Sequence, residues 1–188
     1  MATNTRARLT YRDYLDLPES DDRYELIDGE LYMAPTPIPE HQIFVYYLAK
    51  VIEEFVTRHR LGRMIISPQD VILADNIVVQ PDIMFVSNER LHIIKWGQYV
   101  QGAPDLVVEV LSPSTERFDR TVKRERYARF GVREYWIADI VGRTIEVNVL
   151  NGDKFAVAGV YGEGDTFDAP LLPGLKISVS GVFESAEI

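Results

Sequence analysis

The sequence contains no cysteine, which excludes disulfide bonds and thiolate metal sites and makes a cytoplasmic location the default expectation. It also lacks any apolar run of about 18 residues, so we expect no membrane-spanning helix and no membrane partner. The opening MATNTRARLT has no apolar centre of the kind found in a secretory signal.

The sequence has fewer basic than acidic residues. It contains 20 Lys and Arg and 29 Asp and Glu, which gives a net charge of −9. That balance argues against a protein that coats nucleic acid by charge alone. It is compatible with acidic residues gathered around a divalent cation, and it can conceal a local basic patch.

The sequence has enough apolar residues to form one hydrophobic core. The 188 residues are 46% hydrophobic and 26% charged, which is an ordinary composition for a globular protein. No repeat, low-complexity linker or sharp change of composition divides the chain. We therefore predict a single domain over residues 1–188.

The first third of the chain predicts a helix, a hairpin and a longer helix. Residues 9–20 favour a short helix, and Asp28-Gly29 favours a tight turn between two strands within 24–33. Pro39 favours the start of a helix that continues to about residue 60 and ends at Gly62. Its buried face is expected to contain the apolar residues at helical spacing, namely Ile43, Phe44, Tyr47, Leu48, Val51, Ile52 and Phe55.

Most of the remaining chain predicts strands, with one charged helix over residues 115–130 that ends at Gly131. The strands are expected at 64–73, 77–86, 104–112, 134–139, 144–150 and 154–161, with one more strand or turn within 171–183. Together these elements predict an α+β (α/β) domain whose central mixed β-sheet is flanked by helices.

The strand predicted at 77–86 contains two residues that do not suit a strand. Pro81 cannot donate a backbone hydrogen bond, and Asp82 is costly to bury without a partner. Glu109 repeats the pattern in the apolar run LVVEVL, where alternation puts it on the same face as Val107 and Leu111. A third acid, Glu25, lies in the strand before the Asp28-Gly29 turn.

Each of these acids alone could be a half-exposed strand residue or a turn residue. Two carboxylates on neighbouring buried strands, however, repel each other and lose hydration. Mg²⁺ or Mn²⁺ reverses the sign of that interaction, and a backbone carbonyl of the second strand could add a further oxygen ligand. The three histidines are scattered without a metal-ligand spacing, although His41 lies near the start of the long helix and could face a cleft.

The charged helix concentrates positive charge. Residues 116–133 carry seven basic and three acidic residues, a local net charge of +4. Asp119, Lys123 and Tyr127 share one face of this helix with Phe130, so the face is expected to turn inward and to present an ammonium group toward the sheet. The remaining arginines would line a rim able to attract phosphate. The alternative is a solvated helix in which Lys123 simply pairs with Asp119.

Pro81-Asp82, then Glu109 in an apolar strand, then Lys123 follow one another along the chain in an order that resembles the motif of the PD-(D/E)XK restriction-endonuclease-like superfamily. Within that superfamily the sequence resembles the Uma-two family. The resemblance extends from about residue 9 to 180 and is carried by YELIDGELY, QPDIMFV, PDLVVEVLSPST, the helix with Lys123, and GVREYWIAD. The residue two positions after Glu109 is Leu111, where the superfamily has a lysine. In the Uma-two pattern the lysine is in the following helix, and here Lys123 occupies that place.

The resemblance implies a restriction-endonuclease-like core with the site at one edge of the sheet. Asp82 and Glu109 are implied as ligands of Mg²⁺ (or Mn²⁺), and Glu25 matches an additional acid near the first hairpin. With Lys123 these residues form the predicted catalytic set. We also predict a role in substrate binding for four further residues, Arg120, Arg124, Tyr127 and His41.

The resulting hypothesis is a Mg²⁺-dependent endonuclease that hydrolyses phosphodiester bonds in DNA. Cutting both strands usually requires two active sites, so we expect a homodimer, with Tyr161, Phe167 and Phe183 as interface residues. One alternative is a catalytically silent, nuclease-like scaffold that binds nucleic acid or a protein partner. Another is a structural homodimer domain whose acids have no catalytic role.

Overall fold

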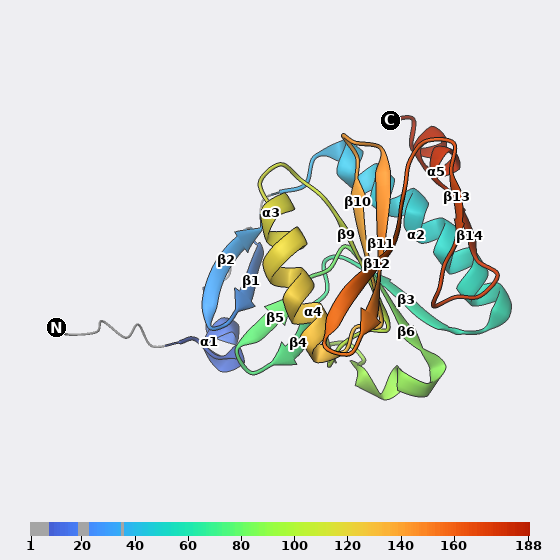
Figure 1. Cartoon of the computed structure of the whole chain (residues 1–188). Helices are drawn as coiled ribbons and strands as arrows, with labels where there is room; N and C mark the ends of the chain where they lie inside the picture. The colour runs from blue at the N-terminus through green and yellow to red at the C-terminus, as the bar shows by residue number, and fades with distance from the viewer. Residues whose placement is uncertain (1–7, 19–22, 35) are drawn as a thin grey trace.

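This computed structural model describes residues 8–18, 23–34 and 36–188. These residues form two mixed six-stranded sheets and a small two-stranded sheet, with helices packed against them (Figure 1). The predicted α+β class with a central mixed sheet is confirmed.

The central sheet has the strand order β12-β11-β10-β9-β6-β3. Only β9 and β10 are parallel, and the other neighbours are antiparallel. Its strands are β3 (Gly62–Ile66), β6 (Ile83–Ser87), β9 (Leu106–Val110), β10 (Glu134–Asp139), β11 (Thr144–Asn151) and β12 (Lys154–Tyr161).

The second sheet has the order β2-β1-β5-β4-β8-β7 and adjoins the central sheet through the chain between β5 and β6. Its strands are β1 (Arg23–Ile27), β2 (Glu30–Ala34), β4 (Val71–Ala74), β5 (Ile77–Val79), β7 (Ile94–Lys95) and β8 (Tyr99–Gln101). The small sheet pairs β13 (Thr166–Asp168) with β14 (Lys176–Ser178).

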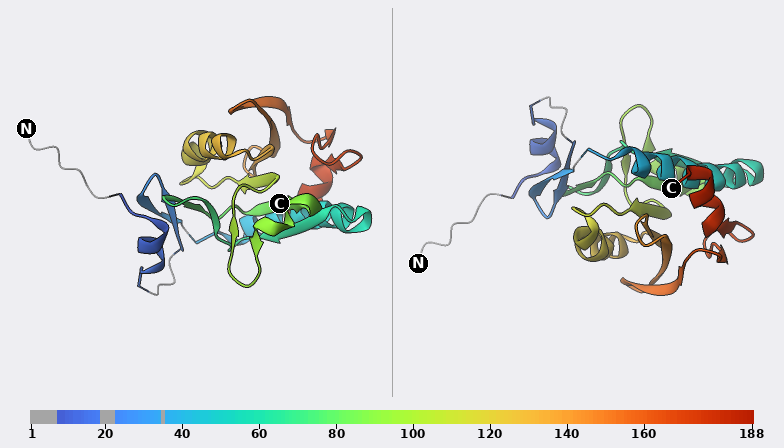
Figure 2. Two further views of the ribbon diagram at one scale, coloured as in Figure 1. Left: turned by 90° about the horizontal axis from the view of Figure 1, so that it is seen from below. Right: turned by 90° about the horizontal axis from the view of Figure 1, so that it is seen from above.

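The helices among the described residues are α1 (Tyr11–Leu15), α2 (Pro39–His59), the 3₁₀ helix η1 (Asn88–Ile93), α3 (Glu116–Phe118), the π-helical turn η2 (Asp119–Lys123), α4 (Arg124–Phe130) and α5 (Val179–Ala186). Helix α1 packs against the second sheet. Figure 2 shows α2 and the α3–α4 helix on opposite sides of the sheet. None of the helices among the described residues is long and apolar enough to cross a membrane.

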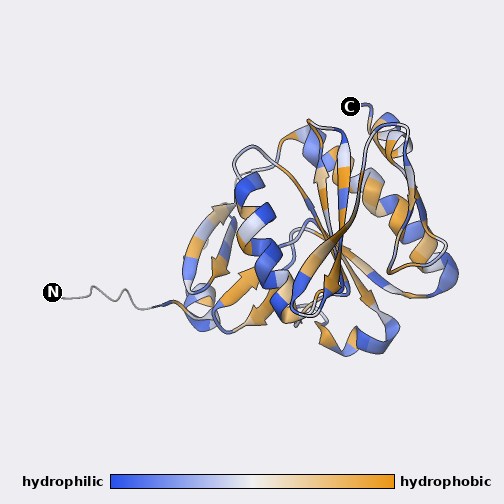
Figure 3. Cartoon of the chain, in the orientation of Figure 1, coloured by the Kyte–Doolittle hydropathy of each residue, from blue (hydrophilic) through white to orange (hydrophobic). Residues whose placement is uncertain are grey.

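Side-chain alternation along β9 separates the two cores. Leu106, Val108 and Val110 pack with residues of α2 and α5, whereas Val107 packs with Tyr127 of α4. Glu109 therefore projects toward the α3–α4 side of the sheet, as the alternation predicts. Apolar residues are concentrated in the strands, and the outward face of the α3–α4 helix is hydrophilic (Figure 3).

Several local predictions are confirmed. Asp28 and Gly29 have φ angles of 54° and 80°, which is the backbone required by a tight turn of this hairpin type. Helix α2 begins at Pro39, and the charged helix ends at Gly131 with φ at 87°.

The end and the buried face of α2 differ from the prediction. Arg60, at φ 54°, ends the helix, whereas Gly62 opens β3, where a Cβ atom would collide with the Val86 carbonyl oxygen. Ile43 is 40% exposed. The buried stripe includes Val45, Ala49 and Val56, which the prediction omitted, because α5 packs beside α2 and widens the contact.

The regions 64–73 and 77–86 each form two strands instead of one. In 77–86, Pro81 and Asp82 lie between β5 and β6, and these strands belong to different sheets. The residues that do not suit a strand thus mark the crossing from one sheet to the other. The first predicted helix is shorter than 9–20, and residues 19 and 20 lie outside the described part of the chain.

The C-terminal region also differs from the prediction, since it ends in α5. Phe167 and Phe183 are 3% and 0% exposed and belong to the core, and Tyr161 stacks on Phe167 with ring centroids 4.5 Å apart. The prediction that Phe167 and Phe183 are interface residues is therefore wrong, because both side chains are buried in the core. Tyr161 is only partly buried, and its place in an interface stays a prediction.

Candidate active site

Asp82 lies at the junction of the two sheets, directly before β6. Its Oδ2 accepts a hydrogen bond from the backbone N–H of Val110 at 2.8 Å. Because Ile83 pairs with Val108, continuing the antiparallel register by one residue sets Asp82 opposite Glu109. The neighbouring strands therefore bring the two predicted metal ligands together.

Glu109 is 3% exposed and its Oε1 has two close donors. The Tyr127 hydroxyl donates to it at 2.6 Å, and Nζ of Lys123 donates at 3.0 Å. Both donors come from the helical segment that covers this face of β9. Their short contacts hold the carboxylate in place at the end of a buried strand.

Lys123 is the centre of a buried ion-pair cluster. Its Nζ lies 2.9 Å from Oε1 of Glu25, 3.0 Å from Oε1 of Glu109 and 3.6 Å from Oδ1 of Asp119. Glu25 is on β1 of the second sheet, and its Oε1 also accepts the backbone N–H of Gln80 at 2.7 Å. One ammonium group thus joins side chains from both sheets and from its own helix.

The charges in this cluster control its protonation. Burial lowers the pKa of Lys123, but Glu109, Glu25 and Asp119 outweigh it, so the pKa is raised well above its ordinary value. The neighbouring carboxylates therefore favour the charged form of Lys123. Burial raises the pKa of Glu109 well above its ordinary value, with Lys123 opposing this rise and Asp119, Asp82 and Glu25 adding to it.

The cluster contains more negative than positive charge. Burial also raises the pKa of Asp119, opposed by Lys123, and its Oδ1 is buried with no hydrogen-bond partner in the described part of the chain. Four carboxyl groups, those of Glu25, Asp82, Glu109 and Asp119, accompany the single ammonium group of Lys123. An excess of buried carboxylates is costly unless a cation compensates it.

His41 lies on the other side of Asp82, in the first turn of α2. It is 7% exposed, with Nε2 2.9 Å from the Val110 carbonyl oxygen and 3.3 Å from Oδ2 of Asp82. Burial lowers the pKa of His41, but the hydrogen bond and the charge of Asp82 outweigh burial and raise the pKa.

The structure brings together six of the eight residues singled out in the sequence, namely Glu25, Asp82, Glu109, Lys123, Tyr127 and His41. It does not bring Arg120 and Arg124 to the cluster. Arg120 pairs with Glu116 and Glu146 at 3.1 Å, and Arg124 donates to Asn148 and to the Phe155 carbonyl. These two arginines hold the helix against β11 and β12.

Sequence reasoning missed two backbone contributions to the site. The amide of Val110 fixes Asp82, and the amide of Gln80 fixes Glu25. Backbone groups carry no residue-type signal, so only the pairing of the strands reveals them. Asp119 did carry a signal, since it is four residues before Lys123 on the inward face, but its spacing alone fits an ordinary helix pair.

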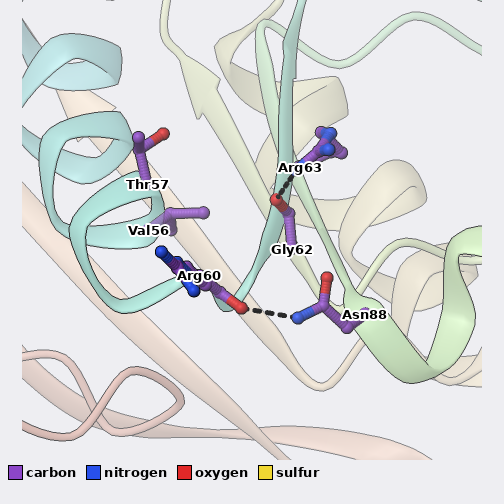
Figure 4. Close-up of a pocket in the computed structure, with 6 residues that line it drawn as sticks. All are labelled: Val56, Thr57, Arg60, Gly62, Arg63 and Asn88. Carbon is purple, nitrogen blue, oxygen red and sulfur yellow. Dashed lines mark hydrogen bonds between the residues drawn. The ribbon is translucent and has the colours of Figure 1, made fainter.

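A surface pocket of about 460 Å³ lies elsewhere, between the end of α2 and the start of β3 (Figure 4). It is lined by Val56, Thr57, Arg60, Gly62, Arg63 and Asn88. Gly62 pairs with Ser87 at the end of β6 away from Asp82. The pocket therefore belongs to the opposite end of the strand pair and contains none of the predicted site residues.

The donor chemistry beside Asp82 fits a hard divalent cation. Among the described residues, no three His, Asp or Glu side chains are already grouped as metal ligands. The available donors are the carboxylates of Asp82 and Glu109 and the carbonyl oxygen of Val110. Mg²⁺ usually binds through one or two carboxylates and keeps several waters, so this small set of oxygens is sufficient.

Two mixed sheets joined at Asp82, with an acid–lysine cluster at the junction, define a restriction-endonuclease-like domain. The chain belongs to the Uma2 family, which is the Uma-two family that its motifs resemble. The model of that family, described as "Putative restriction endonuclease", matches residues 11–180.

A solved structure supports the fold. The chain is similar to a crystal structure from Anabaena variabilis described as "a putative nuclease belonging to DUF820", with a TM-score of 0.79 and 22% sequence identity. The match covers 95% of this chain and 99% of that chain. No curated protein matches the chain.

Proposed function

We propose that the protein is a Mg²⁺- or Mn²⁺-dependent endonuclease that hydrolyses phosphodiester bonds in DNA. The observation that carries this proposal is the position of the Lys123 ammonium, 3.0 Å from a carboxylate of the strand that also fixes Asp82. Membership of a family whose model is described as "Putative restriction endonuclease" supports the same proposal.

Asp82 and Glu109, with the Val110 carbonyl, would hold the cation. When bound, the cation would polarise an attacking water and offset negative charge on the phosphate. Asp82 is kept in position for this by the Val110 amide, and Glu109 by Tyr127 and Lys123.

Within the described ranges, Lys123 has two carboxylate acceptors at hydrogen-bond distance, which would leave one N–H donor for the substrate. An ammonium group has three N–H donors, and Glu25 and Glu109 accept at 2.9 and 3.0 Å. Asp119 is 3.6 Å away, which is beyond hydrogen-bond distance. The third N–H can therefore orient a water or stabilise charge that develops on a phosphoryl oxygen. Glu25 keeps the lysine charged and correctly placed.

The test is nicking of supercoiled plasmid in Mg²⁺ or Mn²⁺ by the wild-type protein and by Asp82→Asn, Glu109→Gln and Lys123→Met. Removing a transition-state interaction of this kind costs on the order of 10²-fold or more in rate. The matched control is Asp153→Asn, which changes an exposed carboxylate in the β11–β12 turn.

We expect the three site variants to lose nicking and the Asp153→Asn protein to retain it. Equal nicking by wild type and Asp82→Asn would trace the activity to a contaminant and remove the proposal. Cation binding without nicking of any DNA would instead favour the catalytically silent scaffold.

A further inference from the structure

Tyr32 is an exposed aromatic residue next to the acid–lysine cluster. It lies on β2 directly opposite Glu25 of β1 in the antiparallel pair. Side chains in such a pair point to the same face of the sheet, with their Cβ atoms about 4.5–5.5 Å apart. Because Glu25 contacts Nζ of Lys123 at 2.9 Å, the Tyr32 ring lies on the cluster side of the hairpin, one strand further out.

Phe118 supports this ring from the helix that carries Lys123. The centroids of the Tyr32 and Phe118 rings are 4.6 Å apart, with an angle of 40° between the rings, and Figure 1 shows β2 and α3 as neighbours. Phe118 directly precedes Asp119 and packs against the core beneath the helix. The Tyr32 hydroxyl donates to Oε2 of Glu30 at 3.2 Å, yet 36% of the residue is exposed. The ring is therefore held in place while part of its surface faces solvent.

Three arginines of the neighbouring helix are engaged by protein groups and not presented to a phosphate backbone. Arg120 and Arg124 pair with side chains of β11, and Arg126 pairs with Asp28 of the first hairpin. The whole chain carries a net charge of −9. Binding of duplex DNA depends on cations that neutralise its phosphates, so a different contact has to supply part of the binding energy.

We propose that Tyr32, supported by Phe118, stacks on an unpaired base of the substrate, and that the protein acts on single-stranded or locally unpaired DNA. In a duplex the faces of each base are covered by its neighbours, whereas an unpaired base can stack on an aromatic side chain, whatever its sequence. This inference rests on the proposed function, because it names the form of DNA that the site would cut.

Arg117 gives this platform a charged neighbour. It directly precedes Phe118 and is exposed, so it can contact the phosphate beside a stacked base. A phosphate contact does not depend on whether the base is present, whereas stacking does. Substitutions of Arg117 and of Tyr32 should therefore have different effects on strands with and without bases.

The first test uses the wild-type, full-length protein and measures fluorescence anisotropy of labelled DNA in the presence of a chelator, so that no strand is cut. Three ligands are compared: a single strand of about 10 nucleotides, a strand of the same length in which a tetrahydrofuran abasic residue replaces every nucleoside, and the corresponding duplex. We expect the normal strand to bind about tenfold more tightly than the abasic strand, and more tightly than the duplex.

The second test repeats these titrations with variants of Tyr32. Tyr32→Ala should lose about tenfold in affinity for the normal strand and nothing for the abasic strand, whereas Tyr32→Phe should keep the wild-type values. Tyr32→Leu retains an apolar contact with Phe118 and should behave as Tyr32→Ala does, which keeps the test decisive if alanine destabilises the hairpin. The matched control is Trp96→Ala, which removes a 70% exposed aromatic side chain between β7 and β8, at the opposite edge of the same sheet from β2.

Arg117→Gln should lower the affinities for the normal and the abasic strand by the same factor. It should also reduce the slope of log affinity against log salt concentration by about 0.7, the value for one phosphate contact to a single strand. Tyr32→Ala should leave that slope unchanged, because stacking releases no counterion from the backbone.

The outcomes separate this inference from the proposed function. Equal affinities of the wild type for normal and abasic strands, tighter binding of the duplex, or a preference for bases that persists in Tyr32→Leu would overturn the stacking role of Tyr32. Each of these results leaves the proposed function standing if the protein still nicks plasmid, because nicking tests the cation site. Failure to bind DNA in any form, together with the absence of nicking, removes both proposals.

Discussion

Nζ of Lys123 lies 2.9 Å from Oε1 of Glu25, so the helix over the central sheet and the first hairpin meet in one buried ion pair. Neither side chain is more than 8% exposed. The pair joins two parts of the fold that share no strand, and the acids around it exceed the single positive charge. Stability and proposed chemistry therefore depend on the same group.

Replacing Lys123 by methionine should destabilise the fold strongly. The change leaves Glu25, Glu109 and Asp119 buried without their common cation, and breaking a buried pair in this way costs about 3–5 kcal/mol. Urea unfolding followed by circular dichroism measures the loss. Lys154→Met, at an exposed position on β12, is the control. Similar stabilities of the two variants would contradict the burial of an essential charge.

Replacing Asp119 by asparagine should have the opposite effect. Burial raises the pKa of Asp119, so its ionised form is less favourable in the folded chain than in the unfolded one. Such a group stabilises the fold below its unfolded pKa and loses that contribution as the pH rises through its folded pKa. At pH 7 we expect Asp119→Asn to be more stable than wild type by on the order of 1 kcal/mol.

The pH dependence distinguishes this effect from a packing change. The stability difference between Asp119→Asn and wild type should shrink as the pH is lowered toward 3.8, the ordinary value of an aspartate. Thermal unfolding across this pH range, in the presence of a chelator, measures it, with Asp153→Asn as control. A variant less stable than wild type at pH 7 would mean that the attraction of Lys123 outweighs burial.

Arg126 should control how firmly the first hairpin is attached. Its Nε and Nη2 both donate to the Asp28 carboxylate, and the hairpin carries Glu25. The Arg126→Gln change removes this two-pronged, partly exposed pair at a cost of about 1 kcal/mol. We expect faster hydrogen exchange in residues 23–34 than in the exposed-site control Arg129→Gln, and equal exchange would show that the pair does not hold the hairpin.

Glu134 should be required for the stability of the fold, because each of its two carboxylate oxygens accepts a hydrogen bond. Its Oε1 accepts from Trp136 Nε1 and its Oε2 from the Leu171 amide, each at 2.6 Å, and the residue is 1% exposed. Glutamine has only one acceptor oxygen, so Glu134→Gln leaves a buried N–H unpaired at a cost of about 1–3 kcal/mol. Chemical unfolding measures this, with the exposed Glu184→Gln as control. Unchanged stability would show that another acceptor replaces the lost oxygen.

Local signals predicted much of the fold. The Asp28-Gly29 turn, the start of α2 at Pro39 and the two faces of β9 follow from backbone preference and alternation within a few residues. The inward face with Lys123 and Tyr127 also followed from spacing. These features depend little on the rest of the chain, which is why the sequence alone was sufficient.

Features that depend on distant partners could not be predicted in the same way. Residues 77–86 look like one apolar strand, and only the arrangement of two sheets divides them at Pro81 and Asp82. Arg124 gains its partners from β11 and β12, so its position in a basic helix did not indicate where it would point. His41 reaches Val110 because α2 crosses the end of β9, a relationship that no spacing in the sequence encodes.

The π-helical turn from Asp119 to Lys123 has a further consequence for how the positive charge reaches the site. A π turn accommodates one extra residue without unwinding the helix on either side. The residues of the turn therefore face a different direction than they would in a regular α-helix, while Tyr127 of α4 still contacts Glu109 of the sheet. In this chain the turn places the Lys123 ammonium 3.0 Å from Oε1 of Glu109, whereas Leu111 stands two residues after Glu109. The positive charge therefore reaches the carboxylate from the helix and not from the strand that carries it.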